Sequence, residues 1–143
     1  MKRSKKITDN YVLLGDDVTN EDQSVELRKA GLDLSIADYT WRVVYYDREL
    51  DMADWEVEKV GYRQSEFIIQ AMGKDPTKSI HPAWSLLSLM SWVATKGEWT
   101  LVSNGTLKFR YNDPGMSGIT LESPRECDLL NLFVQLTLKL LKK

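Results

Sequence analysis

The stretch from Pro82 to Thr95 constrains the fold of this chain more than any other, because a helix drawn through it is apolar around most of its circumference. Its apolar residues are Ala83, Trp84, Leu86, Leu87, Leu89, Met90, Trp92, Val93 and Ala94, and its hydroxyl residues are Ser85, Ser88, Ser91 and Thr95. At about 100° per residue, the four hydroxyl side chains fall within an arc of roughly 120°. Pro82 suits a first helical position, and Lys96-Gly97 is typical of a helix end. The pattern predicts a buried helix over residues 82–95, shorter than the roughly 20 residues that span a bilayer.

A second apolar helix is predicted over residues 124–141, after the start signal Ser123-Pro124. Residues 134–140 also alternate like a strand, so a strand period competes with the helical period there. The polar residues Asp128, Asn131, Gln135, Lys139 and Lys142 gather within an arc of roughly 80° on a helix, and no Leu, Phe or Val falls inside it. Two such helices expose more apolar surface than a small sheet covers. We therefore expect part of the second helix, at Phe133 and Leu140, to remain for a partner chain.

The rest of the chain mixes helix and strand signals and predicts an α+β fold with a small antiparallel sheet and about four helices. The further predicted elements are helices at 20–30 and from 62 or 64 to 72, and strands at 39–46, 99–103, 106–111 and 119–121. A bulge is predicted near Ala37-Asp38, where the alternation changes phase. Residues 47–61 fit both a strand and a helix, and both alternatives stay open.

Asn104-Gly105 is the strongest hairpin signal in the sequence, and it predicts a hairpin over residues 99–111. A two-residue loop at this position would pair Val102 with Leu107 and Trp99 with Arg110. The second pair would form a cation–π contact.

Length and composition indicate one domain, residues 11–143, after a basic flexible arm at residues 1–10. A chain of 143 residues can bury a core without disulfides or metals, and Cys127 is its only cysteine. There is no apolar N-terminal run of the signal-peptide type. We therefore expect a reducing, cytoplasmic compartment, with peripheral attachment to a membrane as the alternative.

Charge is unevenly distributed along a chain whose formal net charge is −2. The N-terminal arm contains Lys2, Arg3, Lys5 and Lys6, and the chain ends with further lysines. Clustered basic residues of this kind bind anionic membrane surfaces or nucleic acid. A solubilising tail is the competing interpretation.

The middle of the chain is acidic, with Asp47, Glu49, Asp51, Asp54, Glu56 and Glu58 close together in sequence. Their spacing matches no calcium-binding loop, and no glycine stands at the position that such a loop requires. The stretch is therefore interpreted as a docking face for a basic partner rather than as a metal site.

The sequence contains no recognisable catalytic constellation, and we predict no catalytic, cofactor-binding or metal-binding residue and no small-molecule substrate. His81 is the only histidine, which excludes catalytic triads with a histidine base and multi-histidine metal sites. Cys127 stands beside Glu126 and Asp128, whose charges oppose a reactive thiolate. No glycine-rich phosphate loop is present.

These features favour a non-catalytic structural or assembly protein that self-associates or docks on a partner protein, with basic termini at a membrane or nucleic acid. The order of elements, with its basic N-terminal arm, is similar to that of small viral matrix proteins, which implies a viral or phage structural role. The alternative is an immunity-type or inhibitor protein that covers a basic partner with residues 47–58. A small metal-dependent hydrolase is the third hypothesis.

Overall fold

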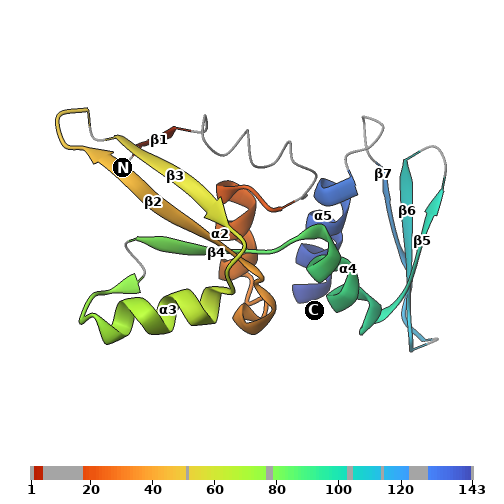
Figure 1. Ribbon diagram of the computed structural model, residues 1–143. Coiled ribbons are helices and arrows are strands. Elements are labelled where there is room, and N and C mark those ends of the chain that lie inside the picture. The colour runs from red at the N-terminus through yellow and green to blue at the C-terminus, as the bar shows by residue number, and fades with distance from the viewer. Residues whose placement is uncertain are drawn as a thin grey trace.

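The computed structural model of the chain is an α+β fold, as predicted, with two sheets rather than one (Figure 1). It describes residues 2–4, 18–50, 52–76, 79–102, 105–113, 115–122 and 129–142, and only the backbone of 2–4 and 44–46. The elements are β1 Lys2–Ser4, α2 Glu21–Lys29, the 3₁₀ helix η1 Leu34–Ile36, β2 Tyr39–Asp47, β3 Met52–Glu58, α3 Tyr62–Ala71, β4 Ile80–Ala83, α4 Leu86–Ala94, β5 Gly97–Val102, β6 Thr106–Tyr111, β7 Ile119–Glu122 and α5 Leu129–Leu141.

The first sheet has the strand order β1-β3-β2-β4, in which β1 runs parallel to β3 and the other pairs are antiparallel. The predicted strand 39–46 is confirmed as β2. Of the two alternatives for residues 47–61, the strand is correct, because β3 covers Met52–Glu58. The bulge lies between Val43 and Tyr45 instead of near residues 37–38. Just before the expected bulge, Asp33 accepts a hydrogen bond from the Ser35 amide at 2.9 Å and starts η1, whose C-cap is Ala37.

The predicted helix at 82–95 begins later than expected, because its first residues form the strand β4. His81 and Pro82 lie in this strand, which pairs only with β2 among the described elements. An edge strand tolerates proline because its missing N–H is not needed there. Helix α4 starts after Ser85, whose hydroxyl accepts a hydrogen bond from the Ser88 amide at 3.1 Å. The helix is also only partly buried, since Leu87 is 72% exposed.

The second sheet has the order β5-β6-β7, and its hairpin register is one residue away from the prediction. Val102 pairs with Thr106 and Trp99 with Phe109. The reason is the connection: the Gly105 amide donates to the Val102 carbonyl at 3.0 Å with Gly105 at φ +86°, as in a three-residue turn. The predicted contact of Trp99 with Arg110 is therefore wrong. Arg110 instead faces Glu98 and forms an ion pair with it.

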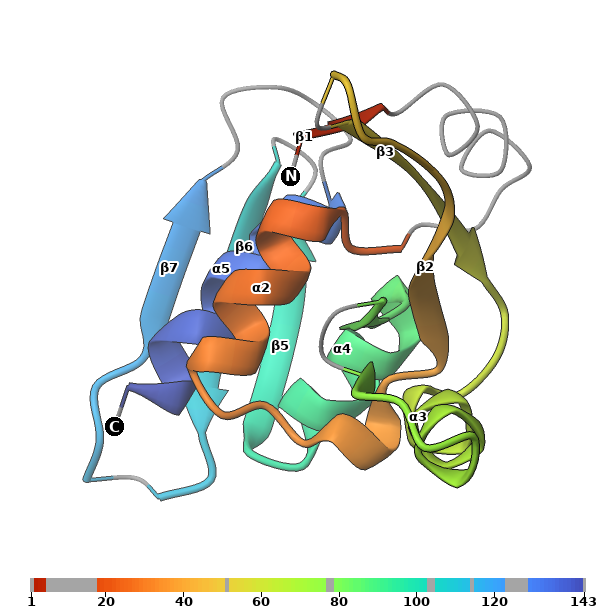
Figure 2. The same cartoon turned by 90° about the vertical axis from the view of Figure 1, so that its left-hand side faces the viewer.

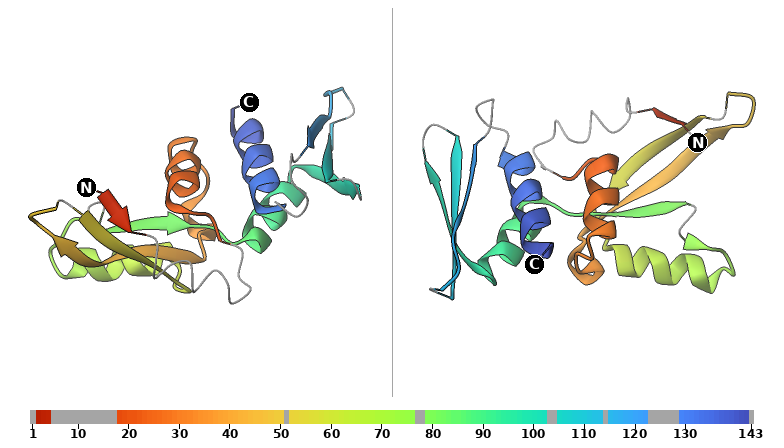
Figure 3. Two further views of the ribbon diagram at one scale, coloured as in Figure 1. Left: turned by 90° about the horizontal axis from the view of Figure 1, so that it is seen from above. Right: turned by 180° about the vertical axis from the view of Figure 1, so that it is seen from behind.

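Helices α2, α4 and α5 lie between the two sheets (Figures 1 and 3). The predicted second apolar helix is confirmed over Leu129–Leu141, while residues 124–128 lie outside the described part of the chain. Helix α5 is buried along most of its length, and the Trp99 ring meets the Phe133 ring edge-on at 5.1 Å. One apolar cluster thus runs from Leu27 on α2 to Phe109 on β6. No helix in the described part of the chain is long and apolar enough to cross a membrane.

Helix α2 confirms the helix predicted at 20–30. Asn20 and Gln23 form a reciprocal capping box: each side-chain oxygen accepts a hydrogen bond from the backbone N–H of the other residue, at 2.8 and 2.9 Å. Gly31 follows the helix with φ +93°. The side of α2 that carries Leu27 packs into the core.

A buried hydrogen-bond cluster joins the first sheet to α4. Thr19 is fully buried, and its hydroxyl lies 3.0 Å from the Trp84 amide and 2.8 Å from the Ser24 hydroxyl. Its carbonyl accepts a hydrogen bond from the Trp41 indole at 2.9 Å. Trp84 follows the last residue of β4, and α4 begins two residues later. The hydrogen bond between Thr19 and Trp84 therefore fixes the point at which the strand ends and the helix follows.

Replacing Thr19 by Val tests the weight of this cluster. The change keeps the volume but leaves the Trp84 amide and the Ser24 hydroxyl without this partner, so we expect a loss of about 1–3 kcal/mol in unfolding free energy. Urea denaturation measures it, with Thr120→Val on the exposed side of β7 as the matched control. A Thr19→Val protein as stable as the control would contradict the role given to the cluster.

Candidate interaction surfaces

Helix α3 carries the most exposed group of large apolar side chains on one element among the described residues. Phe67 is 71% exposed, Ile68 49% and Met72 63%, the last residue lying at the C-cap of the helix. On a helix, positions 67, 68 and 72 fall within an arc of about 140° and form one continuous face. Apolar side chains grouped in this way on a surface are typical of protein-binding sites. We call Phe67, Ile68 and Met72 the α3 face.

The opposite side of α3 is anchored to the rest of the chain. Tyr62 is fully buried, and its amide donates to the Ala37 carbonyl at 2.9 Å. Ser65 lies 3.3 Å from the Thr40 hydroxyl of β2, and Ile69 packs against the main core. The α3 face is therefore held on a fixed element.

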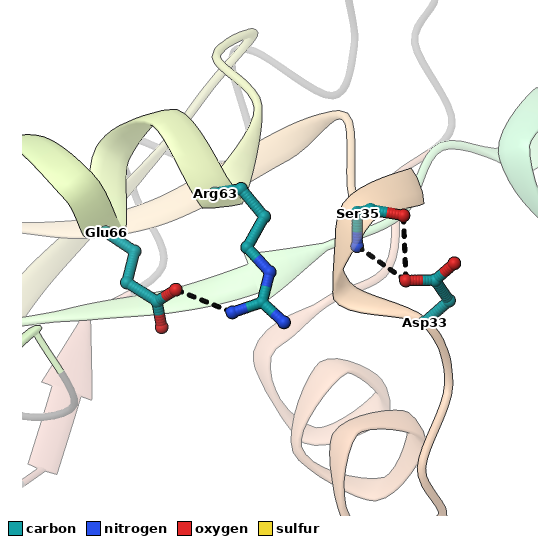
Figure 4. A network of polar contacts seen from close by, with 4 residues as sticks. All are labelled: Asp33, Ser35, Arg63 and Glu66. Atoms are coloured by element: carbon teal, nitrogen blue, oxygen red, sulfur yellow. Dashed lines mark hydrogen bonds and ion pairs between the residues drawn. The ribbon is translucent and has the colours of Figure 1, made fainter.

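A polar network surrounds the start of α3 (Figure 4). Asp33 accepts hydrogen bonds from the Ser35 amide and hydroxyl, and these bonds, with a smaller contribution from the Arg63 charge, hold the pKa of Asp33 below its usual value. Arg63 in turn lies 2.7 Å from Glu66 one turn further along α3. Asp33 and Arg63 are exposed and Glu66 is partly buried, so the network contributes only modestly to stability.

The acidic residues of the sequence do not form one cluster. Asp47 accepts hydrogen bonds from the Glu49 and Leu50 amides and stabilises the β2–β3 turn, while Asp51 lies outside the described residues. Because β3 alternates, its acids all project from one side of the sheet; they are Asp54, Glu56 and Glu58. We call these three residues the β3 acidic row.

The β3 acidic row lies on the same side of the sheet as α3. Glu58 pairs directly with Thr40, whose hydroxyl faces α3. Glu58 is also neutralised in part by Arg42 at 2.6 Å. No group of three or more His, Cys, Asp or Glu residues with the geometry to hold a metal ion occurs within the described ranges.

The two apolar residues predicted to meet a partner are not at the surface. Phe133 is fully buried and Leu140 is buried as well, both by elements of the same chain. The prediction failed because the second sheet covers α5 from one side while α2 and α4 cover others. The surplus apolar surface instead lies on α3, whose helix was predicted but whose faces were not assigned. The signal was present: Phe67 and Ile69 lie on opposite sides of a helix, so one of them has to face away from the core.

The remaining predicted residues are placed as follows. Lys2 and Arg3 lie in β1, beside β3, where only their backbone is described. Residues 5–10 of the basic arm, with Lys5 and Lys6, lie outside the described residues, as does Cys127. Binding of an anionic surface by this arm stays a prediction. His81, in the edge strand β4, stacks on Trp55 of β3, with ring centres 4.8 Å apart.

Tyr62 gives the α3 anchor a pH dependence. Burial raises the pKa of its phenol above the ordinary value, Glu66 raises it further, and the Arg28 charge above the ring, 5.6 Å from its centre, partly opposes this. As the pH rises past roughly 10, the phenol ionises in the unfolded chain before it ionises in the folded one. The free energy of unfolding should therefore fall in this range.

Thermal unfolding between pH 7 and 11 checks this, with Tyr62→Phe as the comparison. We expect the two proteins to differ by no more than about 1 kcal/mol at pH 7, because the phenol makes no hydrogen bond of normal geometry to the described residues. Above pH 10 the wild-type protein should lose stability more steeply than the Phe variant. Parallel curves would show that Tyr62 is not buried as described.

Comparison with known proteins gave no match: no family model, no curated protein and no solved structure is significantly similar to this chain. The residues of the chain and their geometry therefore carry the functional proposal alone.

Proposed function

We propose that this protein is a non-catalytic interaction and assembly protein that docks on another protein chain, either a second copy or a different protein, through the α3 face. The exposure of Phe67, Ile68 and Met72 on one anchored helix is the observation that carries the proposal. We place this activity in a reducing, cytoplasmic compartment, because the sequence has a single cysteine.

The energetics of the α3 face suit a docking role. Burying a large apolar side chain completely contributes about 1.5–3 kcal/mol, and the three residues are each between 49% and 71% exposed. A helix that is already folded and anchored loses little conformational freedom on binding. Few residues can therefore supply most of the binding energy, as is usual at protein interfaces.

The β3 acidic row supports a second candidate, an immunity-type or inhibitor protein that covers a basic site on its partner. Its support is that Asp54, Glu56 and Glu58 share one side of the sheet with α3. Acidic residues that flank an apolar face would accelerate association with a basic partner and select it over acidic ones. Both candidates require the same side of the molecule to meet a protein.

A paired substitution tests the α3 face. In Phe67→Ser/Met72→Ser the exposed apolar side chains are removed with little effect on stability, because neither contributes to the core. We expect association, measured as concentration-dependent mass by light scattering or as a partner captured from the source cells, to weaken at least about tenfold. The control is Leu50→Ser, an exposed apolar residue in the β2–β3 turn. No association by either measure, or the same association in both variants, would contradict the proposal.

Charge reversal separates the two candidates. Asp54→Lys/Glu56→Lys should abolish binding of a basic partner and leave self-association through the α3 face unchanged. The salt dependence of binding provides a second readout, because contacts between exposed charges weaken as ionic strength rises. Binding that neither the reversal nor salt affects would rule out the second candidate.

A further inference from the structure

The free edge of β5 presents unpaired backbone groups in a known pattern. Strand β5 pairs with β6 and with no other strand in the part of the chain that the structure describes. The Asn112 amide donates a hydrogen bond to the Lys96 carbonyl at 3.4 Å. In this register the even-numbered residues of β5 form the backbone hydrogen bonds to β6. Residues alternate in an antiparallel pair, which leaves the N–H and C=O groups of Gly97, Trp99 and Leu101 directed away from β6.

This edge lacks most of the features that protect sheet edges, although it carries one charged side chain, Glu98. Such edges are usually short, or carry proline, lysine or a bulge. The other edges of this protein follow that rule: β1 has three residues, β7 has four, and β4 contains Pro82. Strand β5 has six residues, none of them lysine, arginine or proline, and its pairing with β6 is regular.

The exposure of the side chains on β5 indicates that a neighbouring strand is missing on its outer flank. Leu101 and its partner Leu107 face the same side of the sheet, toward the core. Leu107 is 1% exposed but Leu101 is 40% exposed. Leu101 differs in having no strand on its outer flank among the described elements. On the other side of the sheet, Glu98 forms an ion pair with Arg110 and stays exposed enough to meet a further basic side chain.

We propose that β5 binds an extended segment of a partner protein as an added antiparallel strand, with apolar side chains at alternate positions toward the core and a basic side chain beside Glu98. Backbone hydrogen bonds give such strand addition its affinity, and alternate side chains give it its specificity. The inference rests on the proposed docking function but uses a surface other than the α3 face.

The position of α4 favours a single segment over a second copy of this chain. In Figure 2, β7, β6 and β5 follow one another across the molecule and α4 lies beyond β5. Two copies that joined their β5 strands about a two-fold axis would bring both α4 helices to the same side of the joined sheet. An extended segment needs only the width of one strand, about 4.8 Å.

The test uses a fluorescent peptide with the sequence of residues 106–111, the segment that already pairs with β5 on its inner edge. It has apolar residues at alternate positions and carries Lys108 and Arg110 on the other side. We expect saturable binding with a dissociation constant of about 0.1 mM or lower by anisotropy. A scrambled peptide, and one N-methylated at alternate residues to remove its amide hydrogens, should bind at least about tenfold more weakly.

The matched protein variants are Leu101→Pro and Leu101→Ala. The proline removes an N–H that faces away from β6, so the hairpin keeps its bonds and only the outer edge loses a donor. We expect Leu101→Pro to weaken peptide binding at least about tenfold more than Leu101→Ala does. If Leu101→Pro does not fold, the N-methylated peptide gives the same information on the unaltered protein.

Other results would overturn the inference. These are no saturable binding by the wild-type protein, equal binding of the N-methylated peptide, or a wild-type dimer that the peptide dissociates, which would make a second copy the occupant. Phe67→Ser/Met72→Ser should bind the peptide normally. Loss of peptide binding alone would therefore leave the proposed function standing, and loss of association through the α3 face alone would leave the β5 edge standing.

Discussion

The burial of Trp84 is the constraint on which the rest of the structure depends. Its backbone exchanges two hydrogen bonds with Thr19, each 3.0 Å, and its indole N–H donates to the Asp33 carbonyl at 3.2 Å. The next residue, Ser85, donates from its amide and its hydroxyl to Asp38 at 2.9 and 2.5 Å. One point in the chain thus fixes the segment before α2, the loop before β2 and the start of α4. These bonds hold the first sheet, α2 and α4 together at one place.

The position of these elements determines which apolar surfaces stay exposed outside the core. Helix α4 leads from the first sheet, near Trp84, to the second sheet on the other side of α5. Helix α5 is therefore covered from several sides and lies at the centre of the core. Helix α3 instead lies against the first sheet, with Tyr62 inward and Phe67 outward. Strand β5 ends the second sheet without a neighbour among the described strands. The α3 face and the β5 edge are both consequences of a core built around α5.

Local signals in the sequence predicted most elements but not their environment. The helix at 20–30, the strand at 39–46 and the polar arc of the last helix were predicted from short-range patterns, and each of these elements was confirmed. Two failures have a common cause. Pro82 suits a helix start and an edge strand equally well, and Asn104-Gly105 suits loops of two and of three residues. In both cases the pairing with other strands selects one structure, and the local sequence does not show that pairing. Burial of Phe133 likewise depends on a sheet far away in sequence. The exposed side of α3 could have been inferred, because its apolar residues cannot all face one core.

In the function proposed above, the α3 face meets another protein chain. The most direct measurement replaces Phe67 by the photo-crosslinking amino acid benzoylphenylalanine and irradiates the cells that naturally make the protein. The same replacement at Leu50, which is also exposed, is the reference. The account predicts a covalent adduct of defined mass from position 67 and little or none from position 50. No adduct from position 67, or the same adducts from both positions, would contradict it.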